Sequence, residues 1–378
     1  MDLAERLGVD PGSLEDLEGT FRDDRFRGLP YRHLPDYASS LERGTAIVDH
    51  PDGDPEVVRG FPKVPRTLVL ETGVPRQFED GSVAVEEKLN GYNVRVAPIR
   101  RLGPVAFTRG GIACPFTTAK LRDWHGDELA DLFADRPGAM VCGEVIGPEN
   151  PYTTHDYPEV DSLAFRAFDV RDRETGDPLA VEERRALCSA HGLPQTPLLG
   201  TYDRDEAAGA VAEHVAELSV EGREGVVLKS ADGRRQLKYT TSAANTDDLA
   251  YAFSVPFDYG RDFVFRRLVR EAFHAVESGE RGDELAARAD RIGERILLPM
   301  VETIREVDAG GLAGERHTVR GQPAVVAELL AHLRGQGLRL EIQADCREGD
   351  ERVVTFLKVM RSSTDRTQAY LEGKIVRE

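Results

Sequence analysis

Cysteine, lysine and long apolar runs are all scarce in this chain of 378 residues. The four cysteines (Cys114, Cys142, Cys188 and Cys346) are widely spaced, without a Cys-x-x-Cys pair or a Cys/His cluster. This spacing supports neither a zinc ribbon nor a disulfide framework, so we expect four reduced, buried thiols. No apolar run approaches the ~18 residues of a membrane span. The acidic N-terminus has no signal-peptide core, which favours a cytoplasmic protein without membrane contact.

Net positive charge is also missing, because the formal charge is −18 at pH 7. Such a value usually argues against a nucleic-acid-binding protein, whose contact surface is basic. Lysine is the rarer cation, since only seven of the 49 Lys+Arg are lysine. An acidic, arginine-rich surface suits a halophilic protein, because high salt screens its self-repulsion, and global charge then says little about the substrate. Folding and activity that are best at low salt and decline in molar KCl would contradict this hypothesis.

Periodicity divides the chain into four predicted domains. Residues 1–64 form a small charged module, and residues 65–245 contain short β runs, the first at 67–70, with a few helices between them. Residues 246–316 show helical spacing, and the apolar stripe at 264–307 fits either an internal core or a dimer interface. Residues 317–378 contain a helix and a β-hairpin whose first strand, 338–344, should bury its alternate apolar side chains. This pattern predicts an α+β protein built on antiparallel sheets.

The few lysines mark the candidate site. Lys88 lies between two predicted strands and precedes a Leu-Asn-Gly turn, where its side chain would be held rigidly and face a cleft. A lysine amine becomes nucleophilic when burial or nearby cations favour its neutral form. Lys229, in the Glu-Gly-Val-Val-Leu-Lys run at 224–229, and Lys238, in Gln-Leu-Lys-Tyr at 236–239, could supply such cations. We therefore interpret Lys88 as the carrier of a nucleotide through a phosphoramide bond.

Further motifs follow Lys88 in order: Glu144 in Cys-Gly-Glu-Val-Ile-Gly, Phe168-Asp169 at a strand end, Glu224 and the two lysines. In order and approximate spacing, this set resembles the covalent nucleotidyltransferases, which include ATP-dependent DNA and RNA ligases and mRNA capping enzymes. Within that superfamily, the chain most resembles the archaeal homodimeric ATP-dependent RNA ligases, through residues 86–95, 59–66 and 107–111. Asn90 departs from the usual aspartate, which removes a carboxylate beside the nucleophile but keeps a short hydrogen-bonding side chain.

The resemblance implies an ATP-grasp-like nucleotidyltransferase core and a reaction in three steps. Lys88 would attack the α-phosphate of ATP to form lysyl-AMP, and AMP would then move to an RNA 5′-phosphate. A 3′-hydroxyl would displace AMP and seal a 3′-5′ phosphodiester. When both ends belong to one RNA, the product would be a circle. Mg²⁺ or Mn²⁺ would be required. RNA with 5′-phosphate and 3′-hydroxyl ends is the implied substrate, and a second copy of the chain, paired through residues 246–316, is the implied partner.

The resemblance also assigns roles to the residues around Lys88. Lys229 and Lys238 would lower its pKa and contact the α-phosphate. Glu86, with Glu87 as the fallback, would read the adenine amino group. Phe168 and either Val226 or Val227 would enclose the base. Glu144 would contact the ribose or a metal-bound water, and Glu224 would help hold the divalent ion. Asn93 and Arg109 would contact the nucleotide and the RNA end. Arg95 and Lys63 would contact phosphates.

Alternative functions stay open at this stage. A GTP-dependent capping-type nucleotidyltransferase would use the same lysine, because the choice of base depends on a few hydrogen bonds. A protein that only binds nucleotide and RNA ends is the second alternative. The joint presence of Lys88, Glu144, Glu224, Lys229 and Lys238 argues against it. A DNA ligase is disfavoured because the chain has no room for a large OB-fold and a DNA-encircling domain.

Overall fold

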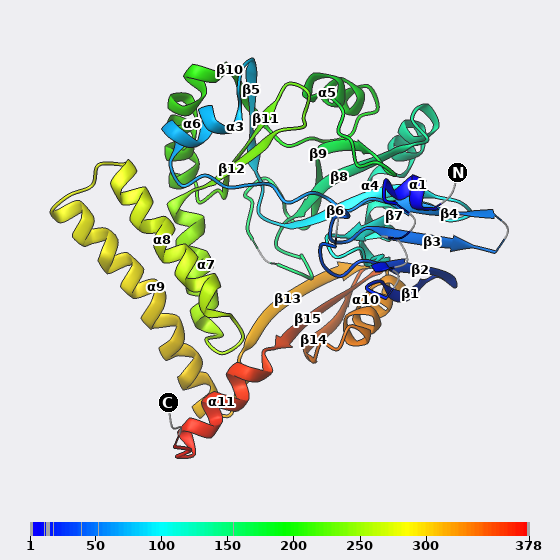
Figure 1. Ribbon diagram of the computed structural model, residues 1–378. Helices are drawn as coiled ribbons and strands as arrows, with labels where there is room; N and C mark the ends of the chain where they lie inside the picture. Colours follow the sequence, from blue (N-terminus) through cyan, green and yellow to red (C-terminus); the bar gives the residue numbers. More distant parts are fainter. Residues whose placement is uncertain are drawn as a thin grey trace.

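The computed structural model describes residues 3–10, 12, 16–17, 19–38, 40–51, 53–153 and 155–375 (Figure 1). Their strands form four sheets, and all named strand pairs are antiparallel. The prediction of a mixed α+β fold with antiparallel sheets is therefore confirmed. Among the helices of these residues, none combines the length and the apolar character that crossing a membrane requires.

Two four-stranded sheets form the centre of the molecule (Figure 1), and the chain passes from the first to the second between Lys88 and Tyr92. The first sheet has the order β10 (Leu198–Asp203), β5 (Ser82–Lys88), β11 (Gly225–Ser230) and β12 (Gln236–Thr240). The second has the order β7 (Gly103–Thr108), β6 (Tyr92–Ile99), β8 (Ala139–Ile146) and β9 (Ala164–Asp172). Helices α3 (Leu70–Gln77) and α6 (Arg204–Val220) pack on the first sheet, while α4 (Pro115–Asp135) and α5 (Val181–Ala190) pack on the second.

The N-terminal region contains a helix and a sheet of its own. Its elements are α1 (Leu3–Leu7), β1 (Arg22–Phe26), β2 (Leu29–His33), β3 (Ala46–His50) and β4 (Gly53–Val58), and the four strands pair in sequence order. Side chains of this sheet, such as Phe26 and Tyr31, share one hydrophobic cluster with Phe107 and Met140 of the second central sheet. The N-terminal module is thus packed onto the centre of the molecule, and the domain boundary at residue 64 stays a prediction.

The C-terminal third begins with three helices and ends with a small α/β unit. Helices α7 (Ser242–Ser254), α8 (Arg261–Glu277) and α9 (Asp283–Asp308) are followed by β13 (Gly314–Gly321), α10 (Pro323–Gly335), β14 (Leu340–Glu348), β15 (Glu351–Val359) and α11 (Arg361–Leu371). The α8–α9 pair projects to one side of the molecule, whereas the β13–β15–β14 sheet lies beneath the second central sheet (Figure 1). The predicted helical region with a following hairpin is present, and β13 adds a third strand to it.

Three local predictions are wrong. Residues 67–70 form no strand, because Leu70 begins helix α3 and buries its side chain with Val74 one helical turn away. The first hairpin strand, β14, pairs only with β15 and lies at the edge of its sheet, so its side chains are not buried as expected. Ile342 in this strand is 38% exposed. Cys346 is exposed for the same reason, while the other three thiols are buried as expected.

Candidate active site

The short turn after Lys88 fixes the position of its side chain. Lys88 is the last residue of β5, and after only three intervening residues β6 begins in the neighbouring sheet. The turn passes so close to β8 that a Cβ at Gly91 would overlap the carbonyl oxygen of Val145, which explains the glycine. The Asn90 N–H donates to the hydroxyl of Tyr157 at 2.6 Å, which holds the turn from the other side. The nucleophile candidate is therefore presented by a rigid backbone.

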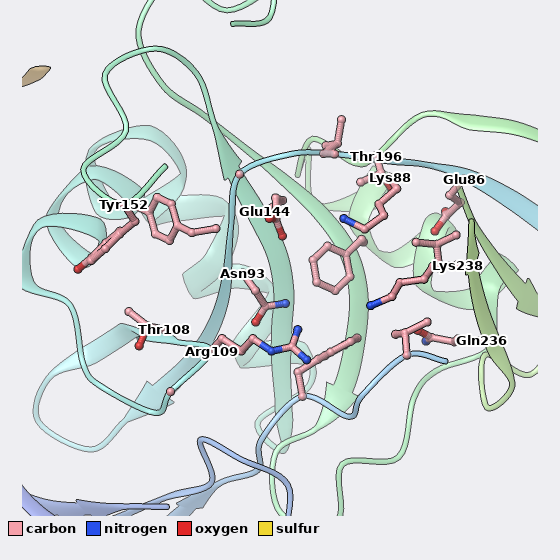
Figure 2. Close-up of a pocket in the computed structure, with 18 of the residues that line it drawn as sticks. Glu86, Lys88, Asn93, Thr108, Arg109, Glu144, Tyr152, Thr196, Gln236 and Lys238 are labelled. Atoms are coloured by element: carbon pink, nitrogen blue, oxygen red, sulfur yellow. The ribbon is translucent and has the colours of Figure 1, made fainter. Parts of the chain in front are cut away.

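The turn opens into a cavity of about 550 Å³ between the two central sheets (Figure 2). The cavity brings together most of the predicted site residues: Glu86, Glu87, Lys88, Asn93, Arg109, Glu144, Phe168, Val227, Lys229 and Lys238 line it. Figure 2 shows Lys88 and Lys238 pointing towards the centre, where Glu144 and Asn93 lie, with Arg109 below them. These residues come from six strands and one loop between positions 86 and 238 of the sequence, so only the fold can gather them.

Glu224 reaches Lys88 through the pairing of β11 with β5. Gly225 lies opposite Lys88 in this register, and its φ of 140° and tight contact with the backbone of Tyr239 require glycine. The preceding carboxylate then lies beside the amine, with Glu224 Oε2 2.5 Å from Lys88 Nζ. In this state Lys88 is therefore an ammonium partner of Glu224.

Glu144 is the second carboxylate near Lys88. Burial between the sheets raises its pKa to about 8, and the charge of Glu224 raises it as well, while Lys88 acts in the opposite direction. The raised pKa means that a second negative charge beside Glu224 is unfavourable unless a cation compensates it. Yet the described residues contain no group of three His, Cys, Asp or Glu side chains that could hold a metal ion. The pair fits a divalent ion that keeps most of its water ligands, as Mg²⁺ usually does.

The pKa of Glu144 leads to a pH prediction. A carboxyl group with a raised pKa in the folded state stabilises the fold below about pH 4.5, and this contribution is lost as the pH rises to about 8. Without nucleotide or metal, the free energy of unfolding of the wild-type protein should thus fall by on the order of 1–3 kcal/mol between about pH 4.5 and pH 8, relative to that of Glu144→Gln. Denaturant unfolding at several pH values measures the difference. Parallel pH profiles for wild type and Glu144→Gln would contradict it, and the exposed Glu213→Gln on α6 serves as the control.

Lys238 approaches the cavity centre from β12. Burial and, after it, the neighbouring cations Arg66 and Lys88 lower its pKa to about 8. The ammonium is thus poorly compensated by protein groups, which favours the approach of an anion. Lys229, by contrast, is already paired: its Nζ lies 2.9 Å from Glu86 Oε2 and donates to the carbonyl oxygen of Phe168.

Glu86 is the centre of a buried ionic cluster that the sequence did not reveal. Its side chain is almost fully buried and contacts Lys229, Arg184 and Arg185, the last at 3.0 Å. These cations hold the pKa of Glu86 below its ordinary value, against the effect of burial. Arginines on a helix such as α5 are too common to mark a site, so no sequence signal singled them out.

The neighbouring Glu87 has a different environment. Burial raises its pKa, and its carboxylate lies 3.6 Å from the guanidinium of Arg223.

Phe168 and Val227 form the two walls of an apolar slot at this end of the cavity. The ring of Phe168 is half-buried and packs edge-on against Phe61 at 5.3 Å. Register decides between the two valines, because Val226 lies in the core beneath the sheet while Val227 lines the cavity. Thr196, which the sequence did not single out, also lines the slot, and its buried hydroxyl has no hydrogen-bond partner.

The structure does not bring Arg95 and Lys63 into the cavity. The Arg95 side chain is fully buried, and its guanidinium donates to backbone carbonyls, among them Gly44 at 2.8 Å and Thr108 at 2.9 Å. Arg95 thus ties the N-terminal module to β6 and β7 and cannot reach a phosphate. Lys63 is exposed and lines a separate surface depression near Gln236. Asn93, in contrast, has a buried Oδ1 without a partner in the cavity wall.

Comparison with known proteins agrees with this geometry. A family model described as RNA ligase matches residues 81–240, and one described as the ligase Pab1020 C-terminal region matches residues 251–374. A solved structure described as an archaeal ATP-dependent RNA ligase is 42% identical and covers 99% of this chain and 98% of its own, with a TM-score of 0.91. The chain belongs to the archaeal ATP-dependent RNA ligase family. The predicted resemblance is thereby confirmed.

Two further relatives show how far the ligase family extends. An uncharacterised protein of Methanocaldococcus jannaschii is 37% identical over 99% of this chain and 96% of its own length. A structure described as a candidate ATP-dependent DNA ligase from Aquifex aeolicus is 27% identical, covers 97% of this chain and all of its own, and has a TM-score of 0.87. The family's architecture therefore includes the N-terminal and C-terminal regions as well as the central sheets.

Proposed function

We propose that the protein is an ATP-dependent RNA ligase whose Lys88 carries AMP. The amine of Lys88 attacks the α-phosphorus of ATP and expels pyrophosphate, which gives lysyl-AMP. AMP then passes to the 5′-phosphate of an RNA, and a 3′-hydroxyl attacks that activated phosphate and releases AMP. The observation that supports this best is the position of Lys88, at the mouth of a cavity that also holds Glu144, Lys238 and an apolar slot.

Each group in the cavity has a place in these steps. Phe168 and Val227 enclose the adenine, and Glu86 Oε2, which lacks a well-aligned hydrogen bond, faces its amino group. Lys238 supplies positive charge where charge develops on the α-phosphate. The groups Asn93 and Arg109 hold the ribose, phosphates and RNA end.

Glu144 and Glu224 hold the divalent ion, which neutralises phosphate charge when bound. A cation held there would share Glu224 with Lys88, and its charge, together with that of Lys238, would favour loss of the Lys88 proton to solvent. The two carboxylates beside Lys88 are the groups that would hold the ion.

The choice of nucleotide and of nucleic acid is tested by intact-mass measurement followed by end-joining assays. With ATP and Mg²⁺ or Mn²⁺, we expect one AMP adduct per chain and, on addition of 5′-phosphorylated RNA, sealed product. GTP should give no adduct, and DNA ends should be joined poorly. A GMP adduct would place the protein with the capping enzymes, and efficient joining of DNA alone would favour the activity described for the Aquifex aeolicus relative.

We also propose that the protein is a homodimer paired through helices α8 and α9. Large apolar side chains remain exposed on both helices: Phe265, Phe273 and Val276 on α8, and Leu285, Leu297, Leu298 and Ile304 on α9. Exposed apolar surface of this extent is typical of an interface between proteins. Of the two interpretations of the apolar stripe at 264–307, an internal core or an interface, the exposure of these side chains favours the interface.

The dimer proposal predicts that charge on this surface separates the subunits. The double variant Phe265→Glu/Leu297→Glu should elute as a monomer, because the new carboxylates would lose their hydration in the interface. Light scattering coupled to gel filtration measures the mass. Leu198→Glu, at an exposed apolar position on β10, should leave the mass unchanged. A wild-type protein that is monomeric at micromolar concentration would refute the proposal.

A further inference from the structure

The cavity extends beyond the groups that the ATP reaction uses. Figure 2 shows Tyr152 at the end opposite Lys238 and Gln236, with Glu144 and Asn93 between the two ends. Tyr92, whose ring packs against Tyr152, and Thr108 lie at the Tyr152 end. One nucleotide whose base lies in the slot of Phe168 and Val227 does not need this second aromatic end.

Tyr152 is held as a rigid aromatic wall. Its hydroxyl lies 3.1 Å from Cys114 Sγ, and its backbone N–H donates to Asn150 Oδ1 at 2.9 Å. Its ring packs against Tyr92 in a T-shaped arrangement with 4.8 Å between the ring centroids. With its hydroxyl anchored in the protein, Tyr152 offers a ring surface to the cavity rather than a polar group.

The C-terminal α/β unit holds the loop that carries Tyr152. His317 of β13, which is 1% exposed, places its Nδ1 3.0 Å from the carbonyl oxygen of Asn150. Arg320 of the same strand donates to Glu149 at 2.9 Å. At the end of α10, Gln336 lines the cavity itself. Residues 314–336 thus support the Tyr152 end from outside the central sheets.

We propose that the Tyr152 end is the subsite for a nucleobase at the RNA ends being joined. This inference rests on the proposed function, since the base of ATP fills the Phe168 slot. Proteins that bind single-stranded RNA stack its bases on aromatic side chains that lie beside a charged path for the backbone. Arg109, Asn93 and Lys88 form such a path between the two ends of the cavity. The base comes from either the 5′-adenylated strand or the 3′-hydroxyl strand, and the experiment separates these sources.

The test measures the two halves of the reaction separately. Adduct formation with ATP follows the first half, and joining of a chemically 5′-adenylated RNA to a 3′-hydroxyl RNA, without ATP, follows the last step. Tyr152→Ala and Tyr152→Leu should form the AMP adduct at the wild-type rate but should join the pre-adenylated RNA about 10-fold or more slowly. Tyr152→Phe keeps the ring and should stay within about threefold of wild type. Tyr370→Leu, on the exposed side of α11, is the control.

Varying each RNA strand in turn identifies the strand that contributes the base, because only its KM should rise. Adduct formation also reports folding of each variant. The inference would be overturned if Tyr152→Leu joined pre-adenylated RNA at the wild-type rate. It would also be overturned if the variant lost adduct formation as strongly as joining, because Tyr152 would then belong to the ATP site. If the wild-type protein formed no adduct, the proposed function would be refuted. The joining of pre-adenylated RNA would then still test whether Tyr152 contributes to RNA binding.

Discussion

Replacing Lys88 with alanine should abolish the AMP adduct, with a decrease of at least about 10,000-fold in its rate of formation. No other cavity amine can substitute, because Lys229 is paired with Glu86 and Lys238 approaches from a different strand. Lys88→Arg should be equally inactive, since a guanidinium is not a nucleophile at ordinary pH. Intact-mass measurement after incubation with ATP and Mg²⁺ gives the result directly.

The same Lys88→Ala protein should retain measurable joining of pre-adenylated RNA, because that step does not pass through the lysine. Lys374→Ala, at an exposed position near the C-terminus, should behave as wild type in both assays. An AMP adduct on the Lys88→Ala protein would place the nucleophile elsewhere. In that case Lys88 would be no more than the ammonium partner of Glu224.

Replacing Glu86 with glutamine should destabilise the protein by about 3 kcal/mol or more. The change leaves Lys229, Arg184 and Arg185 buried around a neutral group, and removal of one partner from a buried ionic cluster typically costs 3–5 kcal/mol. The loss should be greatest above the ordinary pKa of a glutamate, because the lowered pKa of Glu86 stabilises the fold there and this contribution disappears only on acidification. We expect a decrease in Tm of roughly 5 °C or more.

Glu87→Gln, one residue further along the strand, is the matched control. Burial raises the pKa of Glu87, so its loss of charge on substitution removes less stabilisation. Thermal unfolding of both variants at pH 7 makes the comparison. Equal Tm values for the two variants would show that the cluster around Glu86 contributes no special stability. The ATP concentration needed for adduct formation should also rise only in Glu86→Gln, because this change removes the carboxylate that we propose contacts the adenine.

The sequence alone predicted most of the strands and helices between residues 82 and 240, because their periodicity agrees with the final burial. The prediction was wrong where burial depends on a neighbour in space. Residues 338–344 alternate as a half-buried strand does, and Leu338 and Leu340 are partly buried against a core cluster, but Ile342 and Ala344 further along this edge strand are exposed. Residues 67–70 read as a β run, but Leu70 begins helix α3, whose side chains Leu70 and Val74 pack in the core beside the first central sheet.

For the site, the order and spacing of motifs predicted Lys88, Glu144, Phe168 and the later lysines as site residues, and the structure places all of them around one cavity. Tertiary structure decided which of two valines faces the cavity, since register fixes that choice. It also decided the place of Arg95, whose guanidinium donates to the backbone carbonyls of Gly44 in the N-terminal module and Thr108 in β7.

Arg184 contacts Glu86 across 98 positions of the sequence. His317 supports the loop of Tyr152 through the carbonyl oxygen of Asn150, which is 167 positions away. Contacts at such separation leave no pattern in a single sequence, because each residue taken alone looks like an ordinary surface arginine or histidine. What the sequence determined by itself is therefore the candidate nucleophile and the local elements that carry it. The electrostatic surroundings of the nucleotide slot and the second end of the cavity were decided only by tertiary structure, which brings distant side chains into contact.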